Sequence, residues 1–343
     1  MLHLVFLFCC FVWGTSFILL ERVTHVMGPV EIAMWRMFSG AAVVGACWWF
    51  KRDEYRLNWR DFALIAVSSV LFTAPPQVIQ AYVLEQGFGH GFFGTMVAAI
   101  PLLTILVSVP MLGERPTARE FVGVLGGLVC IFLLMAEGMN RGMSLGLLAL
   151  TMIIPLSSAV SNTFYKWKLP HVPAAPLTAL VLVAAGFTLV PLRMSPRWME
   201  SMSVAGPADT VVTPSALTYL LLLGVIGSGI STMAYVWLVL ERGPLFAGMT
   251  TYVVPVIALL WGTLDHEAIS PLQTTAIVGV LGMVALVQSG SKVAEEILEP
   301  AVAVQRGKPR MAAAIEPDAL VSLPIAEIPL SDRRAVQPEA QVA

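Results

Sequence analysis

The sequence predicts an all-α integral membrane protein with ten transmembrane helices, arranged as two inverted repeats of five helices. The first observation behind this prediction is composition: hydrophobic residues make up 57% of the 343 residues, charged residues make up 12%, and the mean hydropathy is +0.80. A soluble domain has about 25% charged and about 45–50% apolar residues. The second observation is the length and spacing of the apolar runs, and the third is a sequence pattern that occurs twice.

Long apolar runs recur along the chain, and a membrane-spanning helix needs about 20 mostly apolar residues. Two runs are interrupted, one by Pro75–Pro76 and the other by Gly227-Ser228-Gly229. The single long connection, residues 194–214, is rich in Pro, Ser and Met and is predicted to be a surface loop. The predicted spans are residues 2–21, 29–50, 61–84, 91–112, 119–137, 144–166, 174–193, 215–240, 244–264 and 272–290.

Basic residues in the short loops predict the orientation, because cytoplasmic loops carry an excess of Lys and Arg. One set of alternate loops should therefore face the cytoplasm, and an even number of spans brings both termini to that side of a bacterial cytoplasmic (inner) membrane. The cytoplasmic set carries Lys51, Arg52, Arg56, Arg60, Arg115, Arg119, Lys166, Lys168 and Arg242, whereas the opposite set carries only Arg22, Arg141, Arg193 and Arg197.

Charge is concentrated in residues 291–343, which hold six Lys or Arg and eight Asp or Glu. We expect this segment to be a disordered cytoplasmic tail, because so polar a sequence cannot bury enough apolar surface to fold. The rest of the chain offers no basic patch for phosphates, which excludes nucleic acid as a partner. The expected partners are the lipid bilayer and a small-molecule substrate, with the protein a monomer or a homodimer and without a cofactor.

Two stretches of sequence repeat. The fourth span contains Pro101-Leu-Leu-Thr-Ile-Leu and is followed by Gly123-Val-Leu-Gly, and the ninth contains Pro255-Val-Ile-Ala-Leu-Leu, followed by Gly279-Val-Leu-Gly. The repeat unit is thus five spans, and an odd number of spans gives the two copies opposite orientations in the membrane. Inverted repeats are typical of secondary transporters, whose substrate site lies between the halves near the midplane. The predicted divisions are residues 1–138, 142–290 and the tail 291–343.

Several short motifs appear in a fixed order along this ten-span frame. They are Phe11-Val12-Trp13-Gly14-Thr15-Ser16-Phe17, Pro29, Trp35-Arg36-Met37, Ala81-Tyr82, Pro101, Gly113-Glu114-Arg115-Pro116, Ala234-Tyr235 and Pro255. Together they resemble the EamA-type family of the drug/metabolite transporter superfamily. The resemblance implies a bundle of two inverted five-helix repeats that exports or exchanges small metabolites, such as amino acids or similar solutes, without ATP.

Arg36 is a charge inside the second predicted span, where insertion of an Arg costs about 2.5–3.5 kcal/mol at the helix centre. Two interpretations are open. The guanidinium could face a central cavity and attract an anionic or carbonyl group of the substrate, or it could reach outward or pair with Glu31 or a backbone carbonyl.

Polar side chains also form faces on the sixth and eighth spans, because their spacing of i, i+3, i+4 and i+7 places them on one side of a helix. Such a face lines a polar cavity or joins packed helices by hydrogen bonds. Asn162 and Tyr235 favour the cavity because both are too large for close helix contact. The two faces are Ser158, Ser161, Asn162 and Tyr165, and Ser228, Ser231, Thr232 and Tyr235.

The third and first spans supply the remaining candidates. Gln77 and Gln80 share a face directly after the two prolines, which should kink the helix and free backbone carbonyls beside the cavity. Trp13 could stack on an aromatic or cationic substrate or pack on Gly14. The predicted substrate-binding residues are Trp13, Arg36, Gln77, Gln80, Asn162 and Tyr235; the weaker cavity-lining candidates are Thr15, Ser16, Ser158, Ser161, Tyr165, Ser228, Ser231 and Thr232; the hinge candidates are Pro75, Pro76, Gly227 and Gly229.

The middle of the predicted spans contains no Asp or Glu, so a carboxylate proton relay is not evident. The sequence also lacks a P-loop and the His-Glu-x-x-His motif of zinc proteases, and it therefore predicts no enzyme and no metal site. The function that these observations favour is a secondary transporter that exports or exchanges small metabolites by alternating access. The alternatives are a membrane-embedded enzyme, or a channel or sensor that does not alternate its access.

Overall fold

The computed structural model describes residues 2–286 except 52–54, 56, 88, 114–117, 141, 196, 198–199, 201–212, 249, 267–268 and 284. The chain divides into two units, Met1–Val293 and Ala294–Ala343. The predicted tail 291–343 and most of the loop 194–214 lie outside the described residues, as do Arg52, Arg56, Glu114, Arg115 and Arg141. All regular structure in the described part of the chain is helical.

The first half of the described chain folds into long helices joined by short connections. The third predicted span consists of three pieces, with a π-helical segment between two α-helical ones. The fourth consists of two α-helices. The elements are α1 (Leu2–Thr24), α2 (Pro29–Lys51), α3 (Trp59–Ser68), η1 (Ser69–Thr73), α4 (Ala74–Glu85), α5 (His90–Val97), α6 (Ile100–Leu112) and α7 (Ala118–Asn140).

The second half has the same organisation. Its eighth predicted span again has a π-helical segment between two α-helices, and its ninth again consists of two α-helices. The elements are α8 (Leu145–Lys168), α9 (Ala174–Arg193), α11 (Pro214–Leu221), η2 (Leu222–Ile230), α12 (Ser231–Arg242), α13 (Pro244–Gly248), α14 (Thr250–Leu264) and an apolar helix over Pro271–Met283.

Length and composition qualify eight of the described helical stretches as membrane spans. The stretches Ile100–Leu112 and Pro271–Met283, at the fourth and tenth predicted positions, are apolar helices too short to qualify. The all-helical membrane class is therefore confirmed, whereas the count of ten spans in two inverted repeats stays a prediction.

Proline and the π-helical segments explain the interruptions of the third and fourth spans. A proline within a helix removes one backbone hydrogen bond and crowds the carbonyl four residues earlier. Pro75 and Pro76 stand in the first turn of α4, directly after η1, whose widened turn closes with a bond from the Ala74 amide to the Ser69 carbonyl. Pro101 stands in the first turn of α6 and follows the break between α5 and α6.

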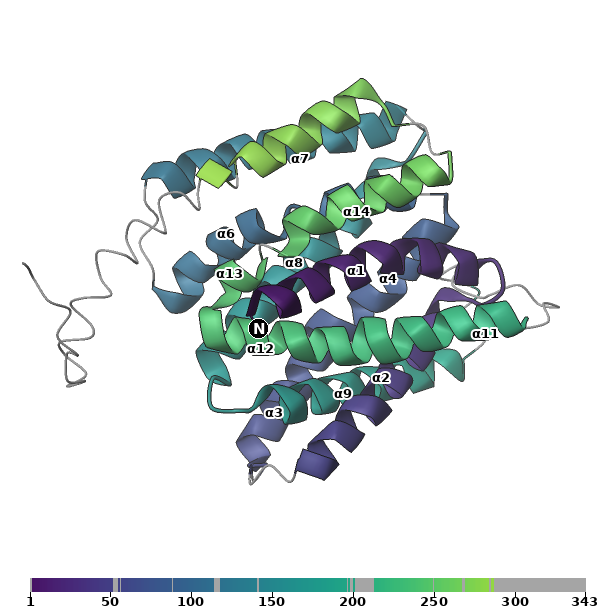
Figure 1. Ribbon diagram of the computed structural model, residues 1–343, viewed down its shortest axis with the longest axis vertical. Coiled ribbons are helices and arrows are strands. Elements are labelled where there is room, and N and C mark those ends of the chain that lie inside the picture. The colour runs from purple at the N-terminus through teal and green to yellow at the C-terminus, as the bar shows by residue number, and fades with distance from the viewer. Residues whose placement is uncertain are drawn as a thin grey trace, which may run out of the picture. The chain divides into compact units, whose positions relative to one another are not determined.

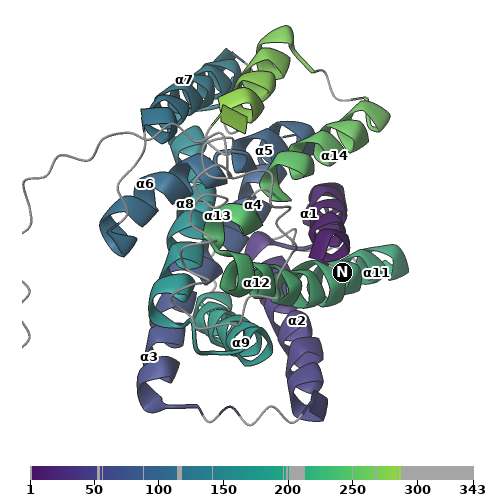
Figure 2. The same ribbon diagram turned by 60° about the vertical axis from the view of Figure 1, so that its left-hand side comes forward.

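Packing between the two halves centres on α2 and α9, which lie side by side (Figure 1). Around this pair, α1 packs on α14, and α6 packs on α8. In both Figures 1 and 2, α7 and the helix Pro271–Met283 lie together at one edge, away from α3 and α9. The two helices approach closely, because a Cβ atom on Gly126 would overlap Sδ of Met283 and one on Gly279 would lie 2.5 Å from Sγ of Cys130.

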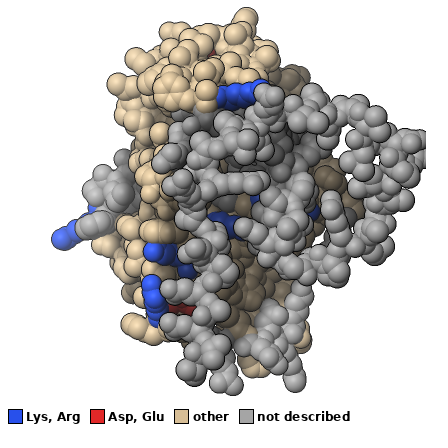
Figure 3. Space-filling model, turned by 90° about the vertical axis from the view of Figure 1, so that its left-hand side faces the viewer, with Lys and Arg blue, Asp and Glu red and all other residues tan. Residues whose placement is uncertain are grey.

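Large apolar side chains cover the outside of the helices. Trp49, Phe50 and Phe132 are 80%, 82% and 67% exposed. On the face shown in Figure 3, most of the described surface is uncharged, with a few Lys and Arg side chains. An apolar exterior of this extent is suited to contact with lipid chains rather than water.

Candidate functional site

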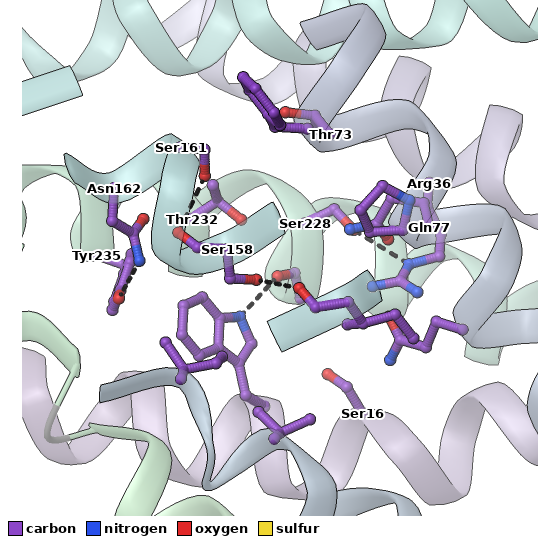
Figure 4. Close-up of a pocket in the computed structure, with 18 of the residues that line it drawn as sticks. Ser16, Arg36, Thr73, Gln77, Ser158, Ser161, Asn162, Ser228, Thr232 and Tyr235 are labelled. Carbon is purple, nitrogen blue, oxygen red and sulfur yellow. Dashed lines mark hydrogen bonds between the residues drawn. The ribbon is translucent and has the colours of Figure 1, made fainter. Parts of the chain in front are cut away.

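A cavity of about 200 Å³ lies among the helices of both halves (Figure 4). Its lining comes from α1, α2, η1, α4, α5 and α6 in the first half, and from α8, α9, η2, α12 and α14 in the second. The described residues of α7 and of Pro271–Met283 do not contribute to it. The cavity thus has walls from corresponding helices of the two halves.

The structure brings the six predicted substrate-binding residues to this cavity. They lie on five different helical elements, yet all line the same space. Their role in binding a substrate stays a prediction. The six are Trp13, Arg36, Gln77, Gln80, Asn162 and Tyr235.

Six of the eight weaker candidates line the cavity as well, and two do not. The hydroxyl of Thr15 accepts a hydrogen bond of 3.1 Å from the indole of Trp261, so Thr15 faces α14 instead. The hydroxyl of Ser231 donates to the carbonyl of Gly227, within its own helix. Thr15 and Ser231 therefore correct the predicted lining. The six that line it are Ser16, Ser158, Ser161, Tyr165, Ser228 and Thr232.

Arg36 faces the cavity and does not reach outward. The residue is 5% exposed, and its Nε donates a hydrogen bond of 3.1 Å to the hydroxyl of Ser228 on η2. The predicted alternative partner, Glu31, instead pairs with Arg193 at 2.5 Å. The Nη1 atom of Arg36 is buried and has no hydrogen-bond partner.

On α8 and α12, Asn162 and Tyr235 form a buried polar pair next to Trp13. The amide nitrogen of Asn162 donates a hydrogen bond of 2.8 Å to the Tyr235 hydroxyl. The rings of Trp13 and Tyr235 are tilted by 53° with centroids 4.7 Å apart, and the Trp13 indole donates to the carbonyl of Gly227 at 3.3 Å. These contacts form one wall of the cavity, where the rings of Trp13 and Tyr235 pack together and their polar groups are hydrogen-bonded.

The hinge candidates lie in or beside the two π-helical segments. Pro76 and Gly227 line the cavity. A Cβ atom on Gly229 would come within 3.0 Å of the Cα atom and carbonyl oxygen of Gly40, so Gly229 forms a tight contact between η2 and α2. Pro75 follows η1 and does not line the cavity. π-Helical turns often occur at functional sites, and whether these four residues act as hinges stays a prediction.

Ion pairs join the two halves at one end of the helices. Because α1 leads by a short connection into α2, the pairs Arg22–Asp265 (2.7 Å) and Glu31–Arg193 lie at one end of the bundle. These side chains are partly exposed. Each pair links one residue of the first half to one of the second.

The other end carries a cluster around Asp61, at the start of α3. Its carboxylate accepts a hydrogen bond of 2.9 Å from the hydroxyl of Tyr55 and lies 3.0 Å from Nε2 of His171, which follows α8. Burial and the neighbouring carboxylate raise the pKa of Tyr55 to about 12, so its hydroxyl stays protonated as the donor. Thus both ends of the bundle carry a polar link between the halves.

Sequence reasoning missed several lining residues. Thr73 of η1 and Thr178 of α9 contribute hydroxyls, and Phe17 and Phe93 contribute rings whose centroids lie 5.1 Å apart. A single threonine in an apolar span gives no signal, because its hydroxyl can bond to a backbone carbonyl of its own helix, as Thr188 does with Ala184.

Comparison with known proteins finds a matching family model, two curated relatives and a solved structure of similar fold. Residues 1–136 match the EamA-like transporter family. The chain is 26% identical over 282 residues to the uncharacterized inner membrane transporter YedA of Escherichia coli strain K12, covering 81% of this chain and 88% of YedA. It is 22% identical to the uncharacterized transporter YoaV of Bacillus subtilis strain 168, covering 76% and 87% of the two chains. A solved crystal structure with 18% identity has a similar fold, with a TM-score of 0.63 over 85% of this chain and 98% of that one.

Proposed function

We propose that the protein, whose residues 1–136 match the EamA-like transporter family, is a secondary transporter of the cytoplasmic membrane. It exports or exchanges small metabolites by alternating access and without ATP. The observation that carries this proposal is the cavity between the two halves, which six predicted polar or aromatic residues line. A polar space amid apolar helices is suited to a solute that has to leave water while it crosses the bilayer.

An inverted repeat of residues 1–138 and 142–290 gives the mechanism its symmetry. Three correspondences support it. A π-helical segment follows the first piece of the third and of the eighth predicted span, namely η1 and η2. The fourth and ninth spans each consist of a short helix followed by a longer one. The contact of α1 with α14 corresponds to that of α8 with α6.

Alternating access needs contacts that form at one end while the other end opens. The pairs Arg22–Asp265 and Glu31–Arg193 close one end, and the cluster of Asp61 with His171 closes the other. Each contact joins the two halves, so rocking of one half against the other would break the pairs at one end at a time. The basic loops orient the Asp61 end and both termini toward the cytoplasm.

The rival functions require features of a different kind. An enzyme of this class needs a nucleophile or a metal with an acid or base at the reacting atom, and the described lining contains no Asp, Glu, His or Cys. A channel needs a continuous water-filled path that conducts without saturation. The cavity between the halves and the polar links at both ends support a carrier instead.

Blocking the cavity tests the proposal. Ser158 lines it, whereas Ile153 lies on the same helix and is 40% exposed. Cells that express the wild-type protein should release a specific solute, which is identified by comparing extracellular metabolites with those of cells lacking the protein. That solute should show saturable counterflow in proteoliposomes. Ser158→Trp should abolish counterflow because the indole fills the space, and Ile153→Trp should retain it. Non-saturable flux, or equal activity of both variants, would overturn the carrier mechanism.

A further inference from the structure

Three buried polar atoms without a hydrogen-bond partner lie on residues that line the cavity. They are Nη1 of Arg36, Oε1 of Gln77 and Oγ1 of Thr178. Their helices, α2, α4 and α9, pack against one another. A buried polar group without a partner costs about 1–3 kcal/mol, and a charged one costs more. Three such atoms in one cavity indicate a ligand that supplies their partners.

The charge of Arg36 defines the first group of this ligand. Its Nε is satisfied by Ser228, and the nearby carboxylate of Glu31 is held by Arg193. Both hydrogens of Nη1 are left without an acceptor. A guanidinium group binds carboxylates well because its donors match the two oxygens. The missing partner is therefore an anionic oxygen.

The amide of Gln77 defines the second group. Its Oε1 accepts hydrogen bonds, and in its buried position it lacks a donor. The ligand must therefore carry a hydroxyl or amine hydrogen in addition to its anionic oxygen. The Thr178 hydroxyl donates or accepts and fits either arrangement.

The net charge of the cavity decides whether the donor to Gln77 is a hydroxyl or an amine. Arg36 is the single charged side chain in the described lining. A monoanion with a hydroxyl neutralises it. An amino acid would add an ammonium group that finds no carboxylate there, and burying an uncompensated charge is strongly unfavourable. The remaining lining, with Trp13, Phe17 and Phe93, accepts an apolar body.

We propose that the cavity binds a small hydroxy monocarboxylate, with the carboxylate on Arg36 and the hydroxyl donating to Gln77. This inference names the substrate class of the proposed transporter and thus rests on the proposed function. Figure 4 shows both residues among the cavity-lining side chains. In the neutral complex that forms, the buried charge of Arg36 is compensated while the halves rock around the site.

Binding to the full-length protein in lipid nanodiscs tests this proposal with four probes: phenyllactate, phenylalanine, phenylpropanoate and phenyllactamide. They share one skeleton and differ in the hydroxyl, the ammonium group or the carboxylate. Equilibrium dialysis at pH 7 should show phenyllactate binding at least about tenfold tighter than each of the other three. Lactate and alanine repeat the comparison for a smaller body. Equal or tighter binding of the amino acids, or no binding of either hydroxy acid, overturns the proposal.

Two variants assign the contacts. Arg36→Gln should weaken phenyllactate binding at least about tenfold and leave phenyllactamide unchanged. Gln77→Leu should reduce phenyllactate to the affinity of phenylpropanoate, whose own affinity it should not change. Gly45→Ala, at a position where an added Cβ meets no atom within 4 Å, is the control. If Arg36→Gln binds phenyllactate as the wild type does, the proposal is wrong.

Counterflow in proteoliposomes separates this proposal from the proposed function, with protein-free liposomes as the measure of passive permeation. Saturable binding of hydroxy acids without any counterflow overturns the transport function and leaves the ligand class intact. Counterflow of another solute class together with absent hydroxy-acid binding overturns the ligand class and leaves the transport function intact.

Discussion

The Nε atom of Arg36 donates a hydrogen bond of 3.1 Å to the hydroxyl of Ser228, which ties the first half of α2 to the π-helical segment η2. The bond satisfies one donor of a guanidinium group that is 5% exposed, and Nη1 stays without a partner. A buried guanidinium group with an unpaired donor is available to bind a ligand, and it contributes little to the folding stability of the ligand-free protein.

The first prediction follows from the unpaired buried charge of Arg36. Arg36→Met should raise the Tm of the empty protein by at least about 2 °C, because it replaces an uncompensated buried charge by an apolar side chain of similar length. It should also abolish transport. Differential scanning fluorimetry in detergent measures the Tm.

Arg193→Met is the matched control for Arg36→Met. It removes an ion pair in which the Arg193 side chain is 46% exposed, and pairs of this kind contribute about 0–1 kcal/mol. Its Tm should therefore stay close to that of the wild type. A lower Tm for Arg36→Met than for Arg193→Met would show that Arg36 stabilises the fold and would contradict its role at the binding site.

The second prediction concerns Asn162 and Tyr235. Tyr235→Phe leaves the Asn162 amide nitrogen buried without its 2.8 Å partner, and Asn162→Leu does the same to the Tyr235 hydroxyl. Each single variant should lose about 1–3 kcal/mol of unfolding free energy. The double variant should lose less than the sum of the two, because no partner is left unpaired. Unfolding in mixed detergent measures the cycle, and strict additivity would mean that the bond does not form.

Many of the cavity-lining residues can be predicted from the sequence by one physical rule: a polar side chain inside an apolar span faces protein or water and avoids lipid. That rule or its aromatic counterpart predicts Trp13, Arg36, Gln77, Asn162 and Tyr235, and all five line the cavity. The rule does not predict toward which neighbouring helix the hydroxyl of a Ser or Thr residue points. Thr15 and Ser16 are neighbours, and only Ser16 faces the cavity.

The error at Ser231 has a geometric cause. Grouping Ser231 with Ser228 assumed 3.6 residues per turn, but η2 is π-helical up to Ile230 and turns more widely. Ser228 and Ser231 therefore do not share one face. Neither π-helical segment has a pattern that separates it from an α-helix in sequence, although prolines or glycines stand at each. The ten-span count is limited in the same way, because the apolar run 91–112 is long enough for a span in sequence, whereas the structure divides it into α5 and α6, and neither helix has the length of a span.

The third prediction tests the close contact of α2 with η2. A Cβ atom on Gly40 would lie 2.9 Å from the carbonyl oxygen of Gly224 and 3.0 Å from the backbone nitrogen of Gly229. Gly40→Ala should therefore lower stability by about 1–3 kcal/mol, since the obstacle is backbone that cannot rotate away. Gly45→Ala on the same helix meets no atom within 4 Å and should be neutral or stabilising by up to about 1 kcal/mol. If the two substitutions change stability equally, α2 and η2 do not pack as closely as the structure shows.

The fourth prediction tests the proposed closure at the Arg22 end. Arg22 and Asp265 are 50% and 30% exposed and form an ion pair at 2.7 Å. Their pair therefore contributes at most about 1 kcal/mol and shifts the balance of open and closed forms by about fivefold or less.

Arg22→Glu should change the initial counterflow rate by a few-fold, since two carboxylates then repel each other across the gap. The double variant Arg22→Glu/Asp265→Arg restores an opposite-charge pair and should restore the rate. High salt should bring the rates of the wild type and of Arg22→Glu closer together, because screening weakens the attraction in the former and the repulsion in the latter. If the double variant stays as altered as Arg22→Glu, the pair does not govern access to the cavity, and opening at this end has to depend on the packing of α1 against α14.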